Sequence, residues 1–193
     1  MRSLCVFCGS QQGHSAAFTA AARSLGTALA ARNIELIFGG SHVGLMGVVA
    51  DAALAGGGKV TGVLPHFMAE KELAHPHLSR LHLVDTMHER KRLMAELAGG
   101  FLALPGGFGT LEEIFEAITW SQLQLHPHPC AILNVAGYYD SLVNFLRSAC
   151  ANGFVRRDQL ASVIVANSVD ELFQQLAAFR PGRSAEWISK KQN

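Results

Sequence analysis

Two adjacent acidic side chains, Glu112 and Glu113, directly follow a glycine-rich loop in this sequence. The positive end of a helix stabilises negative charge, so we expect both carboxylates to be ionised there. An ionised carboxylate beside a bound sugar can stabilise an oxocarbenium-like transition state and position a water molecule. Thr110-x-x-Glu113 also matches a capping box, in which Glu113 would bind the helix start and leave Glu112 free to face a ligand. Spacing alone leaves open which carboxylate takes part in chemistry.

A basic cluster, Arg90-Lys91-Arg92, is the second group that could do chemistry. We expect Thr86 to cap the helix that carries it, because Thr86-x-x-Glu89 also matches a capping box. Arg90 and Lys91 lie nearer this helix start than Arg92 and are better placed to meet a phosphate. Arginine offers a planar, bidentate donor for such a group. We expect Arg92 to lie on a solvated face.

Three glycine-rich segments each follow a short apolar run: Gly9-Ser10, residues 39–47, and residues 105–110. Glycine lets backbone amides approach an anion closely, and a helix start adds its positive dipole end. Ligands of parallel sheets bind at the carboxyl ends of the strands, so three such loops predict a site for a phosphorylated ligand. Neither G-x-G-x-x-G in the first turn nor G-x-x-x-x-G-K-[ST] is present, which disfavours nicotinamide redox chemistry and nucleoside-triphosphate hydrolysis.

Short apolar runs alternate with segments of helical periodicity along the whole chain. Runs rich in Val, Ile, Leu and Phe are typical of strands that are covered on both faces. The alternation predicts an α/β fold, a doubly wound and mainly parallel sheet with helices on both faces. The expected strands are residues 4–8, 35–38, 60–64, 81–84, 101–104, 130–133 and 163–165, and the expected helices are residues 16–32, 45–54, 87–97, 111–123, 138–151 and 169–179.

The composition fits a single globular domain and limits its partners. Of 193 residues, 49% are apolar and 16% are charged, which excludes a disordered chain. The 16 basic and 15 acidic side chains leave a net charge of +1, which is no basic excess for nucleic acid. No apolar run reaches the ~18 residues of a membrane helix. We expect one domain over residues 1–180 and a polar tail over residues 181–193, with neither nucleic acid nor a membrane as partner.

The four cysteines do not resemble an extracellular disulfide framework, so we expect a reduced, cytoplasmic protein. Cys5-x-x-Cys8 could mark redox chemistry or half of a zinc site. On a strand, however, residues three apart point to opposite faces, which favours small apolar side chains in a buried strand. The nine histidines are scattered, and we identify no set of metal ligands among them.

The chemistry-bearing segments resemble those of one family. Residues 105–113, Pro-Gly-Gly-Phe-Gly-Thr-Leu-Glu-Glu, match the P-G-G-x-G-T-x-x-E signature of the LONELY GUY (LOG) family, whose members are cytokinin riboside 5'-monophosphate phosphoribohydrolases once mislabelled lysine decarboxylases. Residues 87–91, Met-His-Glu-Arg-Lys, match its second motif. Residues 5–10, Gly39-Gly40 with residues 44–47, and residues 118–120 also fit, so the resemblance spans about residues 3–165.

The resemblance implies a Rossmann-like homodimer that needs no cofactor. It would hydrolyse the N-glycosidic bond of adenosine monophosphate or its N6-prenylated form, releasing the free base and ribose 5-phosphate. Carried over by position, Arg90 and Glu113 would be the catalytic pair. With the glycine loops, the expected substrate contacts are Gly9, Ser10, Gly39, Gly40, Gly47, Glu72, Lys91, Gly106, Gly107, Phe108, Gly109, Thr110, Leu111, Glu112 and Thr119.

Two alternatives remain at this point. A nucleotide sensor or carrier could use the same fold and phosphate loops without turnover, although simple phosphate capture has no need of a carboxylate. A decarboxylase is less favoured, because no lysine has a recognisable pyridoxal-phosphate setting. The helix after the third loop is apolar on several sides, at Ile114, Phe115, Ile118, Trp120 and Leu123. We therefore expect this helix in a dimer interface, with full burial in a monomer as the alternative.

Overall fold

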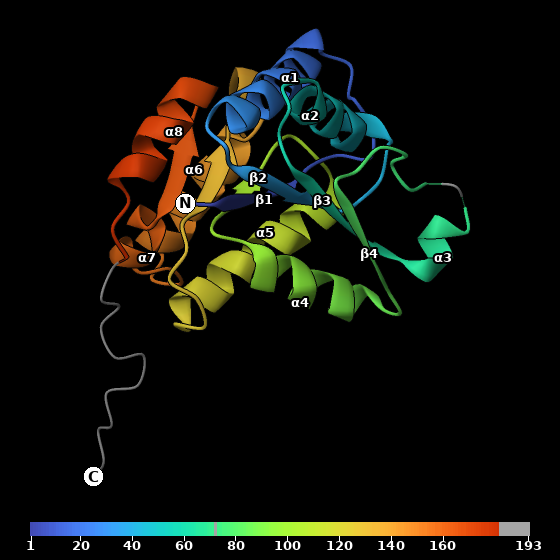
Figure 1. Ribbon diagram of the computed structural model, residues 1–193. Helices are drawn as coiled ribbons and strands as arrows, with labels where there is room; N and C mark the ends of the chain where they lie inside the picture. The colour runs from blue at the N-terminus through green and yellow to red at the C-terminus, as the bar shows by residue number, and fades with distance from the viewer. Residues whose placement is uncertain (72, 182–193) are drawn as a thin grey trace.

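A computed structural model describes residues 1–71 and 73–181 of the chain. Seven strands, all paired in parallel, form one sheet in the order β4-β3-β2-β1-β5-β6-β7 (Figure 1). The predicted doubly wound sheet is thus confirmed, and its strands begin and end within two residues of the expected bounds. They are β1 (Ser3–Phe7), β2 (Glu35–Phe38), β3 (Val60–Pro65), β4 (Arg80–Val84), β5 (Phe101–Ala103), β6 (Cys130–Leu133) and β7 (Val163–Ala166).

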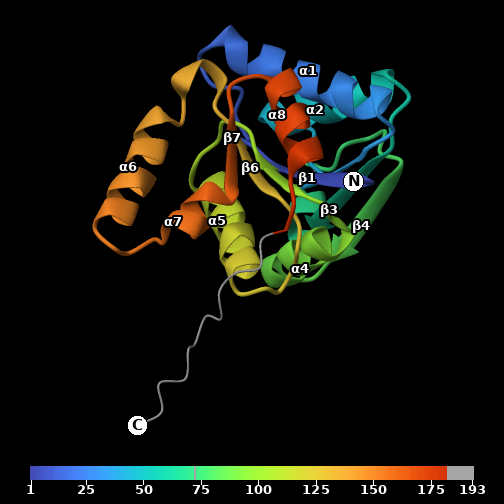
Figure 2. The same ribbon diagram turned by 90° about the vertical axis from the view of Figure 1, so that its left-hand side faces the viewer.

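Helices cover both faces of the sheet. On one face lie α1 (Ala16–Ala31), α2 (Gly44–Ala55) and α8 (Val169–Ala178), and on the other lie α4 (Met87–Leu97) and α5 (Phe108–Gln122) (Figure 1). The strand order reverses between β1 and β5, the point at which open α/β sheets bind ligands. The remaining helices lie nearer the edges of the sheet: α3 (His66–Ala69) beside β4 (Figure 1), and α6 (Asp140–Ala151) and α7 (Arg157–Ala161) near β7 (Figure 2).

Strand β1 shows how alternation builds the two apolar layers. Leu4 and Val6 pack into the layer under α1 and α2, whereas Cys5 and Phe7 pack into the layer under α4 and α5. Cys8 belongs to the first layer, so the Cys5 and Cys8 side chains point to opposite faces, as predicted. Burial raises the pKa of both thiols, which are free. The interpretation of this pair as small buried side chains is confirmed.

One expected helix start is wrong. Helix α5 begins at Phe108, three residues earlier than expected, and Gly107 rather than Thr110 is its N-cap, with no side-chain hydrogen bond at the cap. Thr110 and Glu113 therefore form no capping box. The other predicted capping threonine is correct: the Thr86 hydroxyl accepts the Glu89 N–H at the start of α4 (3.1 Å). The short helices α3 and α7 were not expected, because four or five residues carry too little periodicity to be detected.

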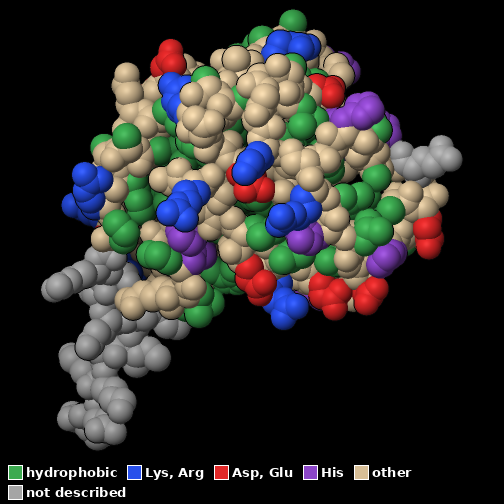
Figure 3. All heavy atoms as spheres, viewed as in Figure 1, with side chains coloured by type: hydrophobic (Ala, Val, Ile, Leu, Met, Phe, Trp, Pro, Cys, Tyr) green, Lys and Arg blue, Asp and Glu red, His purple; other side chains and the backbone are tan. Residues whose placement is uncertain are grey.

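Basic and acidic side chains occur in small groups on the surface. Figure 3 shows basic and acidic side chains of the described residues interspersed on the face that includes α4, without one continuous basic area. Among residues 1–71 and 73–181, the helices are all too short or too polar to traverse a lipid bilayer.

Candidate active site

The three glycine loops meet at the carboxyl edge of the sheet, as predicted. The Gly9 N–H donates to the Pro105 carbonyl (3.0 Å), which joins the loop after β1 to the loop after β5. The Gly9 carbonyl accepts the Leu45 N–H (3.0 Å), which joins the same loop to the start of α2. Gly44 is required at the second junction, because a Cβ there would lie 2.3 Å from the Ser10 carbonyl carbon and its φ is +58°.

The loop before α5 leaves room beside its backbone. A Cβ at Gly107 or Gly109 would meet no atom within 4 Å, so the packing of the chain does not require glycine at either position. The Phe108 side chain between them is 94% exposed. Because no side chain caps α5, its first amides and its positive dipole end face this open space. Such a loop can accept an anion.

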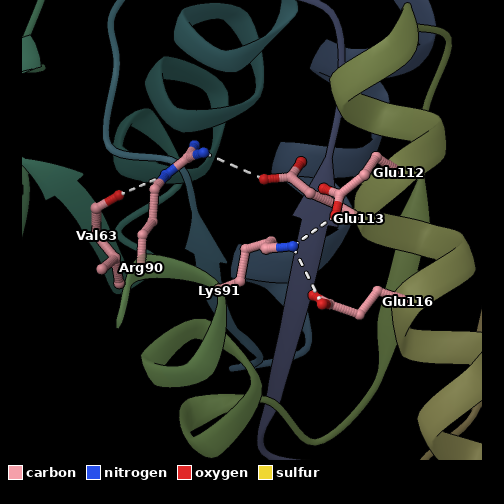
Figure 4. A network of polar contacts seen from close by, with 6 residues as sticks. All are labelled: Val63, Arg90, Lys91, Glu112, Glu113 and Glu116. Atoms are coloured by element: carbon pink, nitrogen blue, oxygen red, sulfur yellow. Dashed lines mark hydrogen bonds and ion pairs between the residues drawn. The ribbon is translucent and has the colours of Figure 1, made fainter. Parts of the chain in front are cut away.

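Arg90 of α4 lies across the ends of the central strands and reaches Glu113 of α5 (Figure 4). Its Nε donates to the Val63 carbonyl of β3 (3.1 Å), and its Nη1 donates to Oε1 of Glu113 (3.2 Å). The two side chains are only 10% and 12% exposed. A Cβ at Gly39 would lie 2.0 Å from Nη2 of Arg90, so the glycine that follows β2 makes room for the guanidinium.

Glu113 is a buried carboxylate held beside a buried cation. Burial raises its pKa above the ordinary value, and the nearby Arg90 guanidinium partly offsets that shift. A crevice beside it is lined mainly by apolar side chains, including Phe7, Phe101 and Trp120, which accounts for the loss of hydration. In such surroundings a charge interacts more strongly with its neighbours than it would in water. This arrangement suits the stabilisation of charge that develops on a bound ligand.

Lys91, the next residue on α4, makes a different set of contacts (Figure 4). Its Nζ donates to Glu112 (2.5 Å) and to Glu116 (3.1 Å), both on α5. Burial by itself would lower the pKa of Lys91, but its hydrogen bonds to the two carboxylates, together with their negative charge, outweigh burial and raise it. The ammonium therefore stays charged and links the two helices.

The chain is similar to a known protein family and to several characterised proteins along most of its length. A family model described as "Possible lysine decarboxylase" matches residues 46–176. The cytokinin riboside 5'-monophosphate phosphoribohydrolase LOG1 of Arabidopsis thaliana is 42% identical over 190 residues, covering 98% of this chain and 89% of that protein. This chain belongs to the LOG family. A probable phosphoribohydrolase of the same kind from Oryza sativa subsp. japonica, LOGL5, is 44% identical over 180 residues, 93% of this chain and 73% of its own.

Solved structures outside the close LOG relatives share the fold. The molybdenum cofactor binding protein of Rippkaea orientalis has a TM-score of 0.70 at 18% identity and covers 92% of this chain and 97% of its own. The molybdenum cofactor carrier protein of Chlamydomonas reinhardtii has a TM-score of 0.68 at 21% identity, with coverage of 92% and 98%. At these identities the likeness concerns architecture alone.

The remaining substrate contacts that the LOG resemblance predicts lie in different parts of the fold. Leu111 packs half-buried against the apolar layer under α4 and α5, and Gly47 of α2 packs against the His42 carbonyl. Thr119 is six residues beyond Glu113, about 9 Å along α5, and its hydroxyl donates to the Phe115 carbonyl (2.7 Å). Glu72 lies outside the described residues. Within the described part of the chain, no three His, Cys, Asp or Glu side chains gather as they would around a metal ion.

Sequence reasoning missed two neighbours of the third loop, Tyr138 and Tyr139. The Tyr138 hydroxyl donates to the Gly106 carbonyl, and the Tyr139 hydroxyl donates to the Leu104 carbonyl, each at 2.7 Å. They are the only two tyrosines of the sequence and follow β6 closely. Aromatic side chains with a polar tip, placed just after a strand, were the signal that could have indicated them.

Proposed function

We propose that this protein hydrolyses the N-glycosidic bond of cytokinin riboside 5'-monophosphates, and of AMP, to give the free base and ribose 5-phosphate. The observation that carries the proposal is the buried Arg90–Glu113 pair beside an open glycine loop. The names of LOG relatives at 42–44% identity support the same reaction. A phosphate site alone would have no use for a carboxylate that burial makes costly to ionise.

The 5'-phosphate would bind at the loop before α5. Gly107 and Gly109 leave space for phosphate oxygens close to the backbone, and the uncapped start of α5 supplies N–H donors and a positive dipole end. Phosphate held there would fix the ribose near Glu113, which lies one and a half turns further along the same helix. Binding energy from the phosphate would thus orient the bond to be broken.

Glu113 and Arg90 would act on the bond itself. As the bond between the anomeric carbon and the base nitrogen breaks, positive charge develops on the ribose, and the Glu113 carboxylate stabilises it or orients the attacking water. Water adds to the anomeric carbon and the base leaves with a proton. Arg90 would hold the substrate and assist the departing base. Its contacts with Val63 and Glu113 keep the guanidinium in place before substrate arrives.

Nucleotide binding without turnover, as in a sensor or carrier, is not favoured. The neighbours that carry a cofactor resemble this chain in fold alone, whereas the phosphoribohydrolases match it along almost its full length. We further propose a homodimer, because the outer face of α5 leaves Phe115 and Trp120 half-buried and Leu123 exposed, while Ile114 and Ile118 are buried within one chain. The four cysteines are free thiols, which suits the cytoplasm.

Chromatography of AMP and of isopentenyladenosine monophosphate after incubation with the protein tests the proposal. We expect adenine or prenyladenine to appear together with ribose 5-phosphate, and neither base to appear with Arg90→Ala or Glu113→Gln. Circular dichroism should show that both variants fold. Binding of nucleotide without release of either base would contradict the proposed reaction. Full activity in either variant would refute the assigned pair.

A further inference from the structure

We propose that Tyr138 is a positioning residue that turns one backbone amide, the Gly107 N–H, towards the 5'-phosphate. The inference rests on the proposed function, since it concerns how that site holds its phosphate. No residue of the LOG signature supplies this hydroxyl, because Tyr138 follows β6 and lies 31 positions beyond Gly107.

The Tyr138 ring is held on two sides although 44% of the residue is exposed. It packs edge-on against Phe18 of α1, with ring centroids 5.4 Å apart, and against Tyr139, at 4.8 Å. These contacts fix the direction of the hydroxyl, which donates to the Gly106 carbonyl (2.7 Å). The side chain therefore braces the loop before α5 from the adjacent strand end.

Planarity of the peptide bond converts this contact into an orientation for an amide. In a trans peptide the carbonyl and the following N–H point in opposite directions. With the Gly106 carbonyl turned to Tyr138, the Gly107 N–H must point away from it. In the part of the chain that the structure describes, this N–H has no hydrogen-bond partner. It is thus a fixed and available donor at the start of α5.

The Gly107 side of this peptide plane has few contacts, whereas Gly106 packs closely against Thr110 and Gly9. Glycine has the widest conformational freedom of any residue, and here two glycines are joined. A Cβ at Gly107 would touch nothing within 4 Å, so packing does not hold that residue. Without the Tyr138 hydroxyl, the Gly107 N–H would be held less firmly, and phosphate binding would have to supply part of the free energy that orients it.

Tyr139 supplies a matched comparison. Its hydroxyl donates to the Leu104 carbonyl (2.7 Å), but the next residue is Pro105, which has no N–H to orient. Tyr139 is 3% exposed and burial raises its pKa. The Tyr139 hydroxyl therefore stabilises the loop before α5 where it leaves β5. Of the two tyrosines, only Tyr138 orients a free N–H, that of Gly107.

The test compares Tyr138→Phe with Tyr139→Phe, because each change removes one hydroxyl and keeps the ring. For Tyr138→Phe we expect the dissociation constant of ribose 5-phosphate, measured by calorimetry, and the KM for AMP to rise about tenfold, with kcat within about threefold. Hydrolysis of adenosine, which lacks the phosphate, should keep its wild-type rate. Tyr139→Phe should lower the melting temperature more and the affinity for ribose 5-phosphate less.

An unchanged dissociation constant in Tyr138→Phe, or an equal loss in both variants, would overturn the inference. Wild-type protein that binds ribose 5-phosphate but releases no base would contradict the proposed function only, and the calorimetric comparison would still decide the role of Tyr138. Wild-type protein that does not bind ribose 5-phosphate would overturn both.

Discussion

Two ion-pair clusters lie side by side between α4 and α5, and they differ in burial. In one, Arg90 meets Glu113, and both side chains are at most 12% exposed. In the other, Lys91 is shared by Glu112 and Glu116, which are 56% and 28% exposed. The first pair is anchored to the sheet through the Val63 carbonyl, whereas the second joins only the two helices.

Arg90 and Lys91 are adjacent in the sequence but have different roles. Consecutive positions on a helix point about 100° apart, so Arg90 faces the strand ends while Lys91 faces the flank of α5. Charge buried at the strand ends can act strongly on a bound ligand. Charge nearer to water contributes little to chemistry but can hold two helices together. The comparison can be tested by changing one member of each cluster.

The largest expected effect is that of Glu113→Gln against Glu116→Gln. Loss of the buried carboxylate should lower kcat about 10²- to 10³-fold, since electrostatic stabilisation of this kind is worth that much in other enzymes. Glu116→Gln should keep kcat within about threefold, because Glu116 contacts only Lys91 among the charged groups of the cluster. Steady-state release of base measures both. Equal losses would remove the distinction between the clusters.

Gly39→Ala should disturb the buried cluster without changing any charge. The added methyl would lie 2.0 Å from Nη2 of Arg90, so the guanidinium must shift. A misplacement of about 1 Å can cost as much as 100-fold in rate, and we expect kcat to fall by at least about tenfold. Circular dichroism and thermal melting would show whether the fold is kept. Wild-type turnover in this variant would mean that the position of Arg90 is not critical.

The pH dependence of activity should follow the raised pKa of Glu113. If the ionised carboxylate is required, kcat/KM for AMP should fall about tenfold for each pH unit below that pKa. The decline should begin at a higher pH than for an ordinary glutamate, whose pKa is about 4.3. A pH-rate profile between pH 4 and 8 measures it, and a rate independent of pH over that range would contradict the requirement.

Stability should change with pH in the opposite sense. Because burial raises the pKa of Glu113, the folded protein binds this proton more tightly than the unfolded chain. The stabilisation that this proton contributes is fully present below the pKa that Glu113 has in the unfolded chain. It is lost as the pH rises through the pKa that Glu113 has in the folded protein. Glu113→Gln removes that loss, so the stability of wild type relative to the variant should decrease from pH 4 to pH 7. Urea unfolding of both proteins at several pH values tests the sign.

The smallest effect is expected from Lys91→Met compared with Arg92→Met. Lys91 is only 12% exposed and joins two helices, so its loss should lower the free energy of unfolding by about 1 kcal/mol. Arg92 pairs with Glu96 at 3.8 Å, with both side chains more than half exposed, and its loss should change stability by less than about 0.5 kcal/mol. Urea unfolding measures both, and equal losses would show that Lys91 is no special link.

Local patterns predicted most of the fold. The central strands are short runs of apolar residues because helices cover both faces of the sheet there, and Leu4 to Phe7 alternate between two apolar layers as expected. The edge strand β4 differs, because it contains Arg80 and His82 and leaves Leu81 and Leu83 exposed. The start of α5 could not be placed in this way. Thr110 offers a capping hydroxyl, but the tertiary contacts of the glycine loop let the helix begin at Phe108 without one. A capping residue in the sequence does not mark the helix start where backbone packing of the preceding loop fixes the direction of the chain.

Residue types and their order were enough to predict that glycine loops, a basic cluster and two carboxylates would collect at one edge of a parallel sheet, because strand ends of one direction share an edge. Tertiary packing pairs Glu113 with Arg90 and Glu112 with Lys91, since these pairings depend on the rotation of two helices about their axes. It also decided the contact of Tyr138 with Gly106, which joins residues 32 positions apart. No local pattern encodes such contacts, because they form only when the whole sheet is assembled.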